Sequence, residues 1–159
     1  MNGKIEKIIV YAAKGAAGVG LAEARFVENL GIEGDFHAKG GERQVSLLFA
    51  ESREFDASTE QGLCLKRFKE NLKIRGSVSP DIKPGTRLSA GEAVLEISGE
   101  TKHCHEECAL YKAGKRCKLA GLNLFARVVK GGFVRVGESV AAILLIISPP
   151  MFSKYVQWR

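Results

Sequence analysis

The chain contains no long hydrophobic segment, no internal repeat and no stretch of low complexity. Its longest apolar run extends from Val140 to Ile147, far short of the ~20 residues that a membrane-spanning helix needs. The N-terminal residues 1–7 mix charged side chains into the first apolar stretch, so they lack the apolar region of a secretion signal. We therefore expect a cytoplasmic protein that does not associate with membranes.

The overall composition is that of an ordinary folded domain. The chain has 159 residues, of which 45% are hydrophobic and 26% are charged, and these values exclude a disordered or fibrous protein. A chain of this length buries roughly 68–70% of its unfolded surface, so it folds without a disulfide or metal. We expect one domain over residues 1–148 and an aromatic tail over residues 149–159 that carries Phe152, Tyr155 and Trp158. The tail either docks on its own domain or faces a partner, for example a second copy in a homodimer.

The charge balance is mildly basic. Lys and Arg total 24 and Asp and Glu total 18, which gives a net charge of +6. This excess raises encounter rates with phosphates and acidic partners. The only short basic cluster, from Lys112 to Lys118, has no interleaved aromatic residues of the kind that single-stranded nucleic acid requires. We therefore expect no nucleic acid partner.

Short apolar segments separated by turn residues predict a mainly β fold, a closed or nearly closed β-barrel with a few short helices. The composition of residues 21–30 allows either a helix or a strand, and residues 51–61 predict a short helix. Gly131-Gly132 predicts a hairpin between two strands. The predicted strands cover residues 5–12, 44–49, 69–75, 86–88, 93–97, 124–129, 133–136 and 139–147.

Three of the four cysteines lie within fourteen residues, in a segment that begins Lys102-His103-Cys104-His105-Glu106-Glu107-Cys108 and continues to Cys117. Cysteines in a reducing compartment are more often ligands, reactive thiols or buried apolar residues than disulfides. Lys102 and the two histidines beside Cys104 favour its thiolate, which is the nucleophilic form. Cys64 has apolar neighbours, and we expect it in the core.

Three hypotheses account for this cluster. In the first, Cys104 or Cys108 is a reactive or cofactor-ligating thiol that attacks a persulfide or binds a thiophilic metal. In the second, Cys104, Cys108 and Cys117 bind structural zinc together with His103 or His105, which stabilises an interaction domain. In the third, the cysteines are ordinary small residues of a loop.

A glycine-rich loop before the strand at 44–49 gathers Asp35, His37, Arg43 and Gln44. Arg43 is suited to bind a phosphate or carboxylate with two hydrogen bonds, and His37 is suited to donate a proton near neutral pH. The alternative is a structural turn in which Asp35 caps backbone donors. Glu70-Asn71 is a weaker candidate, and the residues alone favour a solvated strand end.

Four segments together resemble the MOSC domain, named for the C-terminal domain of molybdenum cofactor sulfurases, and most of all its small stand-alone bacterial members. These segments are GIEGDFHAKGGERQVSLL at 31–48, KENLKIRG at 69–76, KHCHEECALY at 102–111 and LFARVVKGGFVRVGESV at 124–140. The resemblance implies a β-barrel and a role in molybdenum cofactor or sulfur handling. Members of the family are proposed to bind molybdopterin or to carry sulfur as a cysteine persulfide, which amounts to a sulfur-transferase-like activity.

The resemblance also implies partners and site residues. The sulfur would come from a pyridoxal phosphate-dependent cysteine desulfurase, or the chain would act beside a molybdopterin-assembly protein. The matching cysteine is Cys104, with Cys108 beside it, while Lys102 would stabilise the anion and Arg43 would bind the pterin phosphate. The residues that match the family's polar loop and its Glu-Asn pair are Gly34, Asp35, His37, Arg43, Gln44, Glu70 and Asn71.

Overall fold

The computed structural model describes residues 2–49, 62–63, 68–76, 81–99, 104–115 and 123–143. Several predicted features lie outside them, namely the helix at 51–61, Cys64, Lys102, His103, Cys117 and the aromatic tail at 149–159.

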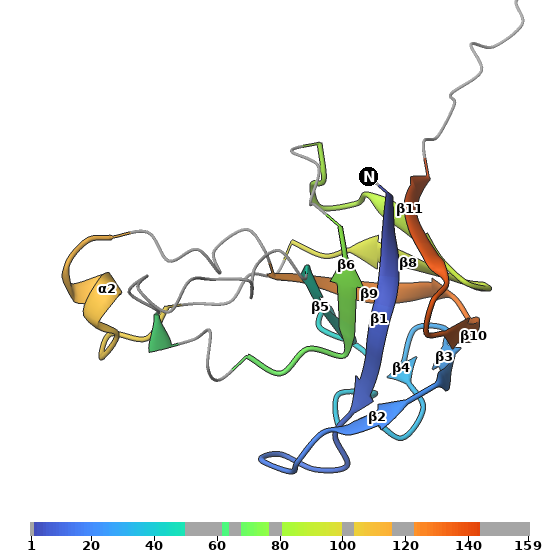
Figure 1. Ribbon diagram of the computed structural model, residues 1–159, viewed down its shortest axis with the longest axis horizontal. Coiled ribbons are helices and arrows are strands. Elements are labelled where there is room, and N and C mark those ends of the chain that lie inside the picture. Colours follow the sequence, from blue (N-terminus) through green and yellow to red (C-terminus); the bar gives the residue numbers. More distant parts are fainter. Residues whose placement is uncertain are drawn as a thin grey trace, which may run out of the picture.

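A closed barrel of seven strands forms the body of the molecule (Figure 1). Around the barrel the strands follow the order β11, β7, β8, β9, β5, β6 and β1, and pairing of β1 with β11 closes the circle. Neighbouring strands are antiparallel except β5 and β6, which are parallel. The mainly β prediction is thus confirmed. The strands are β1 (Asn2–Val10), β5 (Val45–Phe49), β6 (Leu72–Arg75), β7 (Arg87–Ala90), β8 (Ala93–Ile97), β9 (Asn123–Lys130) and β11 (Ser139–Ile143).

Beyond the barrel, β2 (Val19–Leu21) pairs with β1, and a small second sheet has the order β10, β3, β4. Its strands are β10 (Gly132–Arg135), β3 (Glu23–Val27) and β4 (Gly31–Ile32). Residues 21–30 therefore contain strand rather than helix, because Ala24 and Phe26 alternate as buried positions with exposed neighbours.

The predicted hairpin at Gly131-Gly132 is wrong, because β10 pairs with β3 and not with β9. Instead, the two glycines allow the backbone to pass close to neighbouring segments of the chain. A Cβ atom on Gly131 would lie 2.8 Å from the Phe26 carbonyl oxygen, and one on Gly132 would lie 2.6 Å from the Glu92 Cβ. The chain thus passes from the barrel to the second sheet at this point.

Alternating apolar positions along the strands fill a single core. In β6, Leu72 and Ile74 are buried on the same face, as the alternation predicts. The second sheet joins the same core through Phe26 and Val134. Burial of apolar side chains is the main favourable contribution to folding, so the two sheets stabilise each other.

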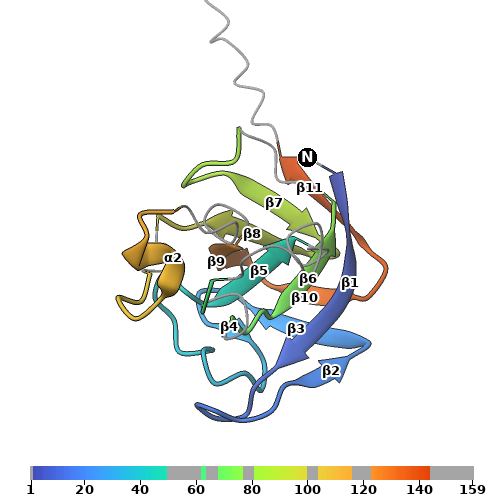
Figure 2. The same cartoon turned by 60° about the vertical axis from the view of Figure 1, so that its left-hand side comes forward.

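A short helix, α2 (Ala109–Lys112), lies outside the barrel, apart from its strands (Figures 1 and 2). It follows the cysteine-bearing residues 104–108 directly. None of the described helices is long and apolar enough to cross a membrane.

Candidate functional site

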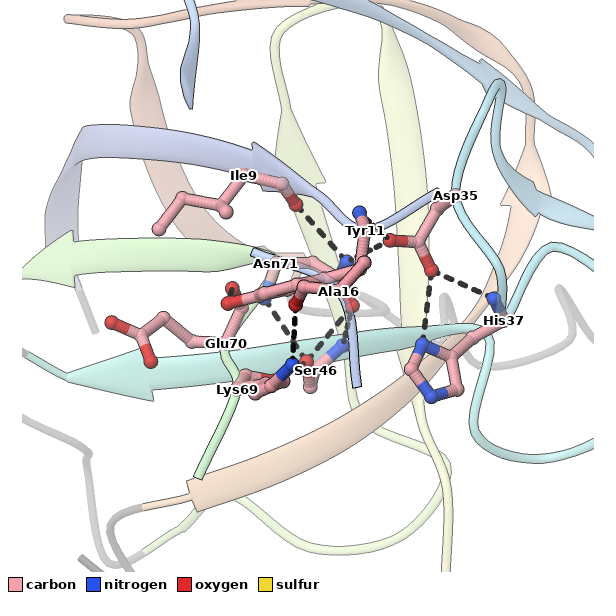
Figure 3. A network of polar contacts seen from close by, with 9 residues as sticks. All are labelled: Ile9, Tyr11, Ala16, Asp35, His37, Ser46, Lys69, Glu70 and Asn71. Atoms are coloured by element: carbon pink, nitrogen blue, oxygen red, sulfur yellow. Dashed lines mark hydrogen bonds and ion pairs between the residues drawn. The ribbon is translucent and has the colours of Figure 1, made fainter. Parts of the chain in front are cut away.

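A buried carboxylate organises the polar residues at the end of β1. The Asp35 Oδ2 atom accepts hydrogen bonds from the Tyr11 backbone N–H at 2.9 Å and from Asn71 Nδ2 at 3.0 Å. The Asp35 Oδ1 atom accepts one from the His37 backbone N–H at 2.8 Å. Hydrogen bonds of this kind are needed because a buried carboxylate without partners is very unfavourable (Figure 3).

Asn71 connects this carboxylate to three strands. Its Nδ2 atom also donates to the Ile9 carbonyl oxygen at 3.1 Å, and its Oδ1 atom accepts the Ser46 backbone N–H at 3.0 Å. The Asn71 N–H donates to Ser46 Oγ at 3.0 Å. The parallel register of β5 and β6, which pairs Leu47 with Leu72, brings the preceding residues Ser46 and Asn71 together. Asn71 is thus a structural link at the start of β6 and not a solvated strand end.

His37 contacts the same carboxylate through its ring. The Nδ1 atom lies 3.0 Å from Asp35 Oδ1, and the Asp35 side chain is 0% exposed while the His37 side chain is 50% exposed. A carboxylate oxygen that already accepts hydrogen bonds is best matched by a proton on Nδ1. This tautomer leaves Nε2 as the ring nitrogen that is available to a ligand.

Gln44 holds the loop that carries Arg43. Its side-chain oxygen accepts the Val128 backbone N–H at 2.9 Å, and its Nε2 atom donates to the Gly41 carbonyl oxygen at 2.8 Å. The side chain is buried, so both groups need these partners. Gln44 therefore attaches the glycine-rich loop to β9.

A pocket of about 320 Å³ opens beside this network. Among the described residues that line it, three carry a permanent positive charge, and none is Asp or Glu. The Arg43 guanidinium lies over the Phe125 ring at 5.0 Å, and Lys69 Nζ lies over the Tyr11 ring at 4.9 Å while donating to the Ala16 carbonyl oxygen. The lining residues are Tyr11, Ala13, Lys14, Gly15, His37, Arg43, Ser46, Phe68, Lys69, Asn71 and Phe125. The pocket thus combines cations with aromatic faces and is suited to an anion attached to a planar ring.

The residues predicted to bind a cofactor separate into two groups. His37, Arg43 and Asn71 line the pocket. Asp35, Gln44 and Glu70 are buried and are not among its lining residues. The Glu70 carbonyl oxygen accepts a hydrogen bond from the Tyr11 hydroxyl at 3.2 Å.

Lys14, Ser46, Lys69, Phe68 and Phe125 line the pocket but were not predicted from the sequence. Lys69 directly precedes the Glu-Asn pair, and Lys14 lies in the loop after the first strand. Their positions at strand ends are the one feature of the sequence that could have marked Lys14 and Lys69 as candidates. Their convergence depends on the strand order β9, β5, β6, β1, which local sequence patterns do not show.

The two described cysteines lie in different environments, and neither is among the residues that line the pocket. Cys104 is exposed, whereas Cys108 is buried directly before α2. The Leu63 backbone N–H donates to Cys108 Sγ at 3.5 Å. This bond, followed by those from the Tyr111 and Leu110 backbone, lowers the pKa of the Cys108 thiol below its ordinary value, although burial opposes the change.

The described residues contain no group of three or more His, Cys, Asp and Glu side chains that could bind a metal ion. His105 is exposed beside Cys104. Cys117 and His103, which complete the predicted zinc ligands, lie outside the described residues. The zinc hypothesis stays a prediction.

Comparison with known proteins gives a family match and several similar folds. The family model "MOSC domain" matches residues 33–141. YuaD from Bacillus subtilis is similar in structure, with a TM-score of 0.59, 20% identity, and coverage of 88% of this chain and 94% of that chain. YiiM from Escherichia coli has a TM-score of 0.54 and 20% identity, with coverage of 91% and 70%. A hypothetical protein has a TM-score of 0.57 and 19% identity, with coverage of 89% and 67%. A search of the curated proteins found no match.

Proposed function

Since the chain belongs to the MOSC domain family, which is linked to molybdenum cofactor-related function, we propose that its cationic pocket binds a phosphorylated pterin of the molybdenum cofactor type. The observation that carries this proposal is the lining of the pocket, which presents three cations, aromatic faces and, among the described residues, no carboxylate. When bound, such a cofactor supplies a metal centre capable of redox chemistry or of accepting sulfur.

The donors in the pocket fit the phosphate of such a ligand. Charge-assisted hydrogen bonds from Arg and Lys to phosphate are roughly twice as strong as neutral ones. Lys14, Arg43 and Lys69 line the same pocket although they come from three different segments of the chain. The phosphate is therefore assigned to these three cations.

The aromatic walls fit the ring system. The Phe68 and Phe125 rings lie 6.1 Å apart between centroids, at an angle of 62°. Planar heterocycles pack well against such faces. The volume of about 320 Å³ lies at the lower end of the range of ~300–1,000 Å³ for ligand pockets. The pocket therefore suits one phosphate with part of a ring system, and a larger cofactor would extend beyond it.

The binding test compares phenyl phosphate with inorganic phosphate by titration calorimetry. We expect phenyl phosphate to bind more tightly, because only it reaches the aromatic walls. Loss of a hydrogen bond to a charged group costs about 1.5–3 kcal/mol, so Arg43→Gln should weaken binding about ten-fold or more. Arg75→Gln, on the outer face of β6 where Arg75 contacts Glu6, is the matched control and should leave binding within two-fold. If Arg43→Gln binds phenyl phosphate as tightly as the unmodified protein does, the proposal is wrong.

Pterin carried through purification gives an independent readout. Denaturation of the purified protein should release a fluorescent pterin from the unmodified chain and less of it from Arg43→Gln. Release in equal amounts from both proteins would assign the pterin to another site.

A second candidate function is sulfur carriage by the cysteine-bearing segment 104–108, supported by the exposure of Cys104. The Cys104 thiolate would attack the outer sulfur of a donor persulfide, forming an S–S bond while the donor leaves as a thiolate. The partner would be a pyridoxal phosphate-dependent cysteine desulfurase, which gives sulfur to the chain, or a molybdopterin-assembly protein, which receives sulfur from it. Cys104 is assigned this step because a donor enzyme can reach it, whereas Cys108 is buried.

The test for sulfur carriage measures cyanide-labile sulfur after incubation with a persulfide donor and removal of that donor. About one sulfur per chain is expected in the unmodified protein. Cys104→Ala should lose this sulfur and Cys108→Ala should retain most of it. Full retention by Cys104→Ala would exclude this assignment.

A further inference from the structure

The Asp35–His37 pair has a feature that anion binding alone does not require. Each Asp35 oxygen accepts a hydrogen bond from at least one N–H group, and the side chain is completely buried. A proton on either oxygen would have to displace one of these donors. The carboxylate therefore presents Oδ1 to the His37 ring as a fixed acceptor.

The His37 ring joins this acceptor to the pocket. Its Nδ1 atom lies 3.0 Å from Asp35 Oδ1, and the half-exposed ring is part of the pocket lining. The Phe36 ring meets the imidazole edge-on, with 5.4 Å between the ring centroids. With its proton on Nδ1, the neutral ring offers only the Nε2 lone pair, and a lone pair cannot donate to an anion.

The charges around the ring are unequal. Lys14 from the loop after β1, Arg43 from the loop before β5 and Lys69 from the segment before β6 share the pocket with His37, while Asp35 is the anion in contact with it. Lys39 lies over the Phe36 ring at 3.7 Å, and the Tyr11 phenol donates to a backbone oxygen. While the pocket holds no ligand, the three cations disfavour a positive charge on the His37 ring. A bound dianion instead attracts that charge.

We propose that His37 takes up a proton when a dianionic oxyanion, such as a phosphate monoester or sulfate, binds in the pocket, and that Asp35 is the positioning residue for this uptake. The inference rests on the proposed function because it concerns the same site. It adds that affinity for the anion rises as pH falls, because binding is coupled to the uptake of a proton.

The proton balance of this step is simple. Nε2 of the neutral ring takes one proton from solvent, and the resulting imidazolium donates Nε2–H to an anion oxygen. The Nδ1–H group of His37 keeps its hydrogen bond to Asp35 Oδ1, and the negative charge of Asp35 balances the imidazolium. No bond within the ligand forms or breaks.

The experiment follows the imidazole nitrogens by ¹⁵N NMR during titration with sulfate, which keeps both charges near neutral pH. His37 is assigned by comparison with His37→Gln. At about pH 7.5 we expect the Nδ1–H tautomer without sulfate and the doubly protonated ring with it. Asp35→Asn should lose the Nδ1–H tautomer, because an amide N–H in place of an oxygen favours a proton on Nε2.

Affinity supplies the second measurement, which needs no variant of the buried Asp35. From about pH 6 to about pH 8, the sulfate affinity of the unmodified protein should fall about five-fold, whereas that of His37→Gln should stay constant. Phenyl phosphate should give the same NMR change and bind more tightly than sulfate, which would identify an organic phosphate as the ligand. If phenyl phosphate binds no more tightly than sulfate, the ligand is a free oxyanion.

The outcomes separate the two proposals. Sulfate and phenyl phosphate that bind while the His37 ring stays neutral would overturn the proton uptake and leave the anion site intact. The proton uptake would also be overturned if the sulfate affinity of His37→Gln depended on pH in the same way as that of the unmodified protein. Failure of both anions to bind would overturn the proposed function together with this inference.

Discussion

The walls of the pocket and the cysteine-bearing segment around α2 are built in different ways. Behind the pocket, Asp35, Asn71 and Ser46 connect β1, β5 and β6 through side-chain hydrogen bonds in a buried setting. At α2, the described contacts of Cys108 Sγ come from backbone N–H groups, and Cys104 is exposed. The polar residues behind the pocket are thus held by the barrel (Figure 3), whereas the thiol of Cys104 is exposed beside α2, which lies outside the barrel (Figure 1).

This division suits the two proposed functions. A preformed site loses little conformational entropy on binding, which favours a ligand held by a few charged groups. A sulfur carrier instead has to meet a donor and an acceptor, and exposure of its thiol serves both encounters. The predictions below test whether the two regions differ as the structure indicates.

The largest effect is expected at Asn71. Asn71→Ala removes one of the two donors to Asp35 Oδ2 and the side-chain partners of the Ser46 N–H and the Ile9 carbonyl, all in a buried network. Unpaired buried polar groups cost about 1–3 kcal/mol each, so the free energy of unfolding should fall by about 3 kcal/mol or more. Urea unfolding measures this change. Cys104→Ala, at an exposed position outside the barrel, should change stability by less than about 0.5 kcal/mol, and a similar loss in both variants would contradict the comparison.

Gln44 should have the next largest effect. Gln44→Ala leaves the Val128 N–H without its partner and detaches the loop that carries Arg43 from β9. We expect a loss of about 2 kcal/mol in unfolding free energy and weaker binding of phenyl phosphate. Lys7→Ala, at an exposed position of β1, is the control for both measurements. Unchanged ligand binding in Gln44→Ala would show that the loop keeps its position without this link.

The two cysteines should differ in their reactivity. Iodoacetamide at neutral pH should alkylate Cys104 about ten-fold faster than Cys108, because Cys108 is buried even though hydrogen bonds lower the pKa of its thiol. Both cysteines lie on one tryptic peptide, residues 103–112, so fragmentation of that peptide by tandem mass spectrometry separates the two rates. Faster alkylation of Cys108 would place the accessible thiol at that position instead.

The smallest effect belongs to the outer wall of the barrel. Hydrogen bonds from Arg127 and then Arg87 hold the pKa of Glu96 below its ordinary value of 4.5. A carboxylate whose pKa is lower in the folded state stabilises the fold above its unfolded pKa, and this contribution disappears as pH falls through the folded pKa. Glu96→Gln should therefore lose a fraction of a kcal/mol at about pH 7, and the difference should vanish well below pH 4.5. Urea unfolding at both pH values gives the measurement, and a difference that persists in acid would point to packing.

Local patterns predicted a closed or nearly closed barrel, but they did not predict all of its strand connections. Residues 93–97 form the predicted strand because alternate positions are buried. Gly131-Gly132 has the composition of a hairpin turn, yet contacts with Phe26 and Glu92 direct the chain into the second sheet. A pairing that joins β10 to β3, over a hundred residues earlier, leaves no signal in either segment alone.

The same limit applies to the site. Arg43, His37 and Asn71 were predicted from their residue types and their motifs, and all three line the pocket. Lys14 and Phe125 reach it because β9, β5, β6 and β1 are neighbours in the sheet, so the start of β9 and the loop after β1 lie at the same pocket. Sequence reasoning therefore found the polar residues that a motif marks, and the structure supplied the cations and rings that surround them.

A crystal structure of the protein with phenyl phosphate tests the central claim most directly. Our account predicts the phosphate among Lys14, Arg43 and Lys69 with the phenyl ring against Phe68 or Phe125. A phosphate found instead in the hollow on the outer face lined by Lys4, Lys7 and Arg75, with the pocket empty, would contradict it.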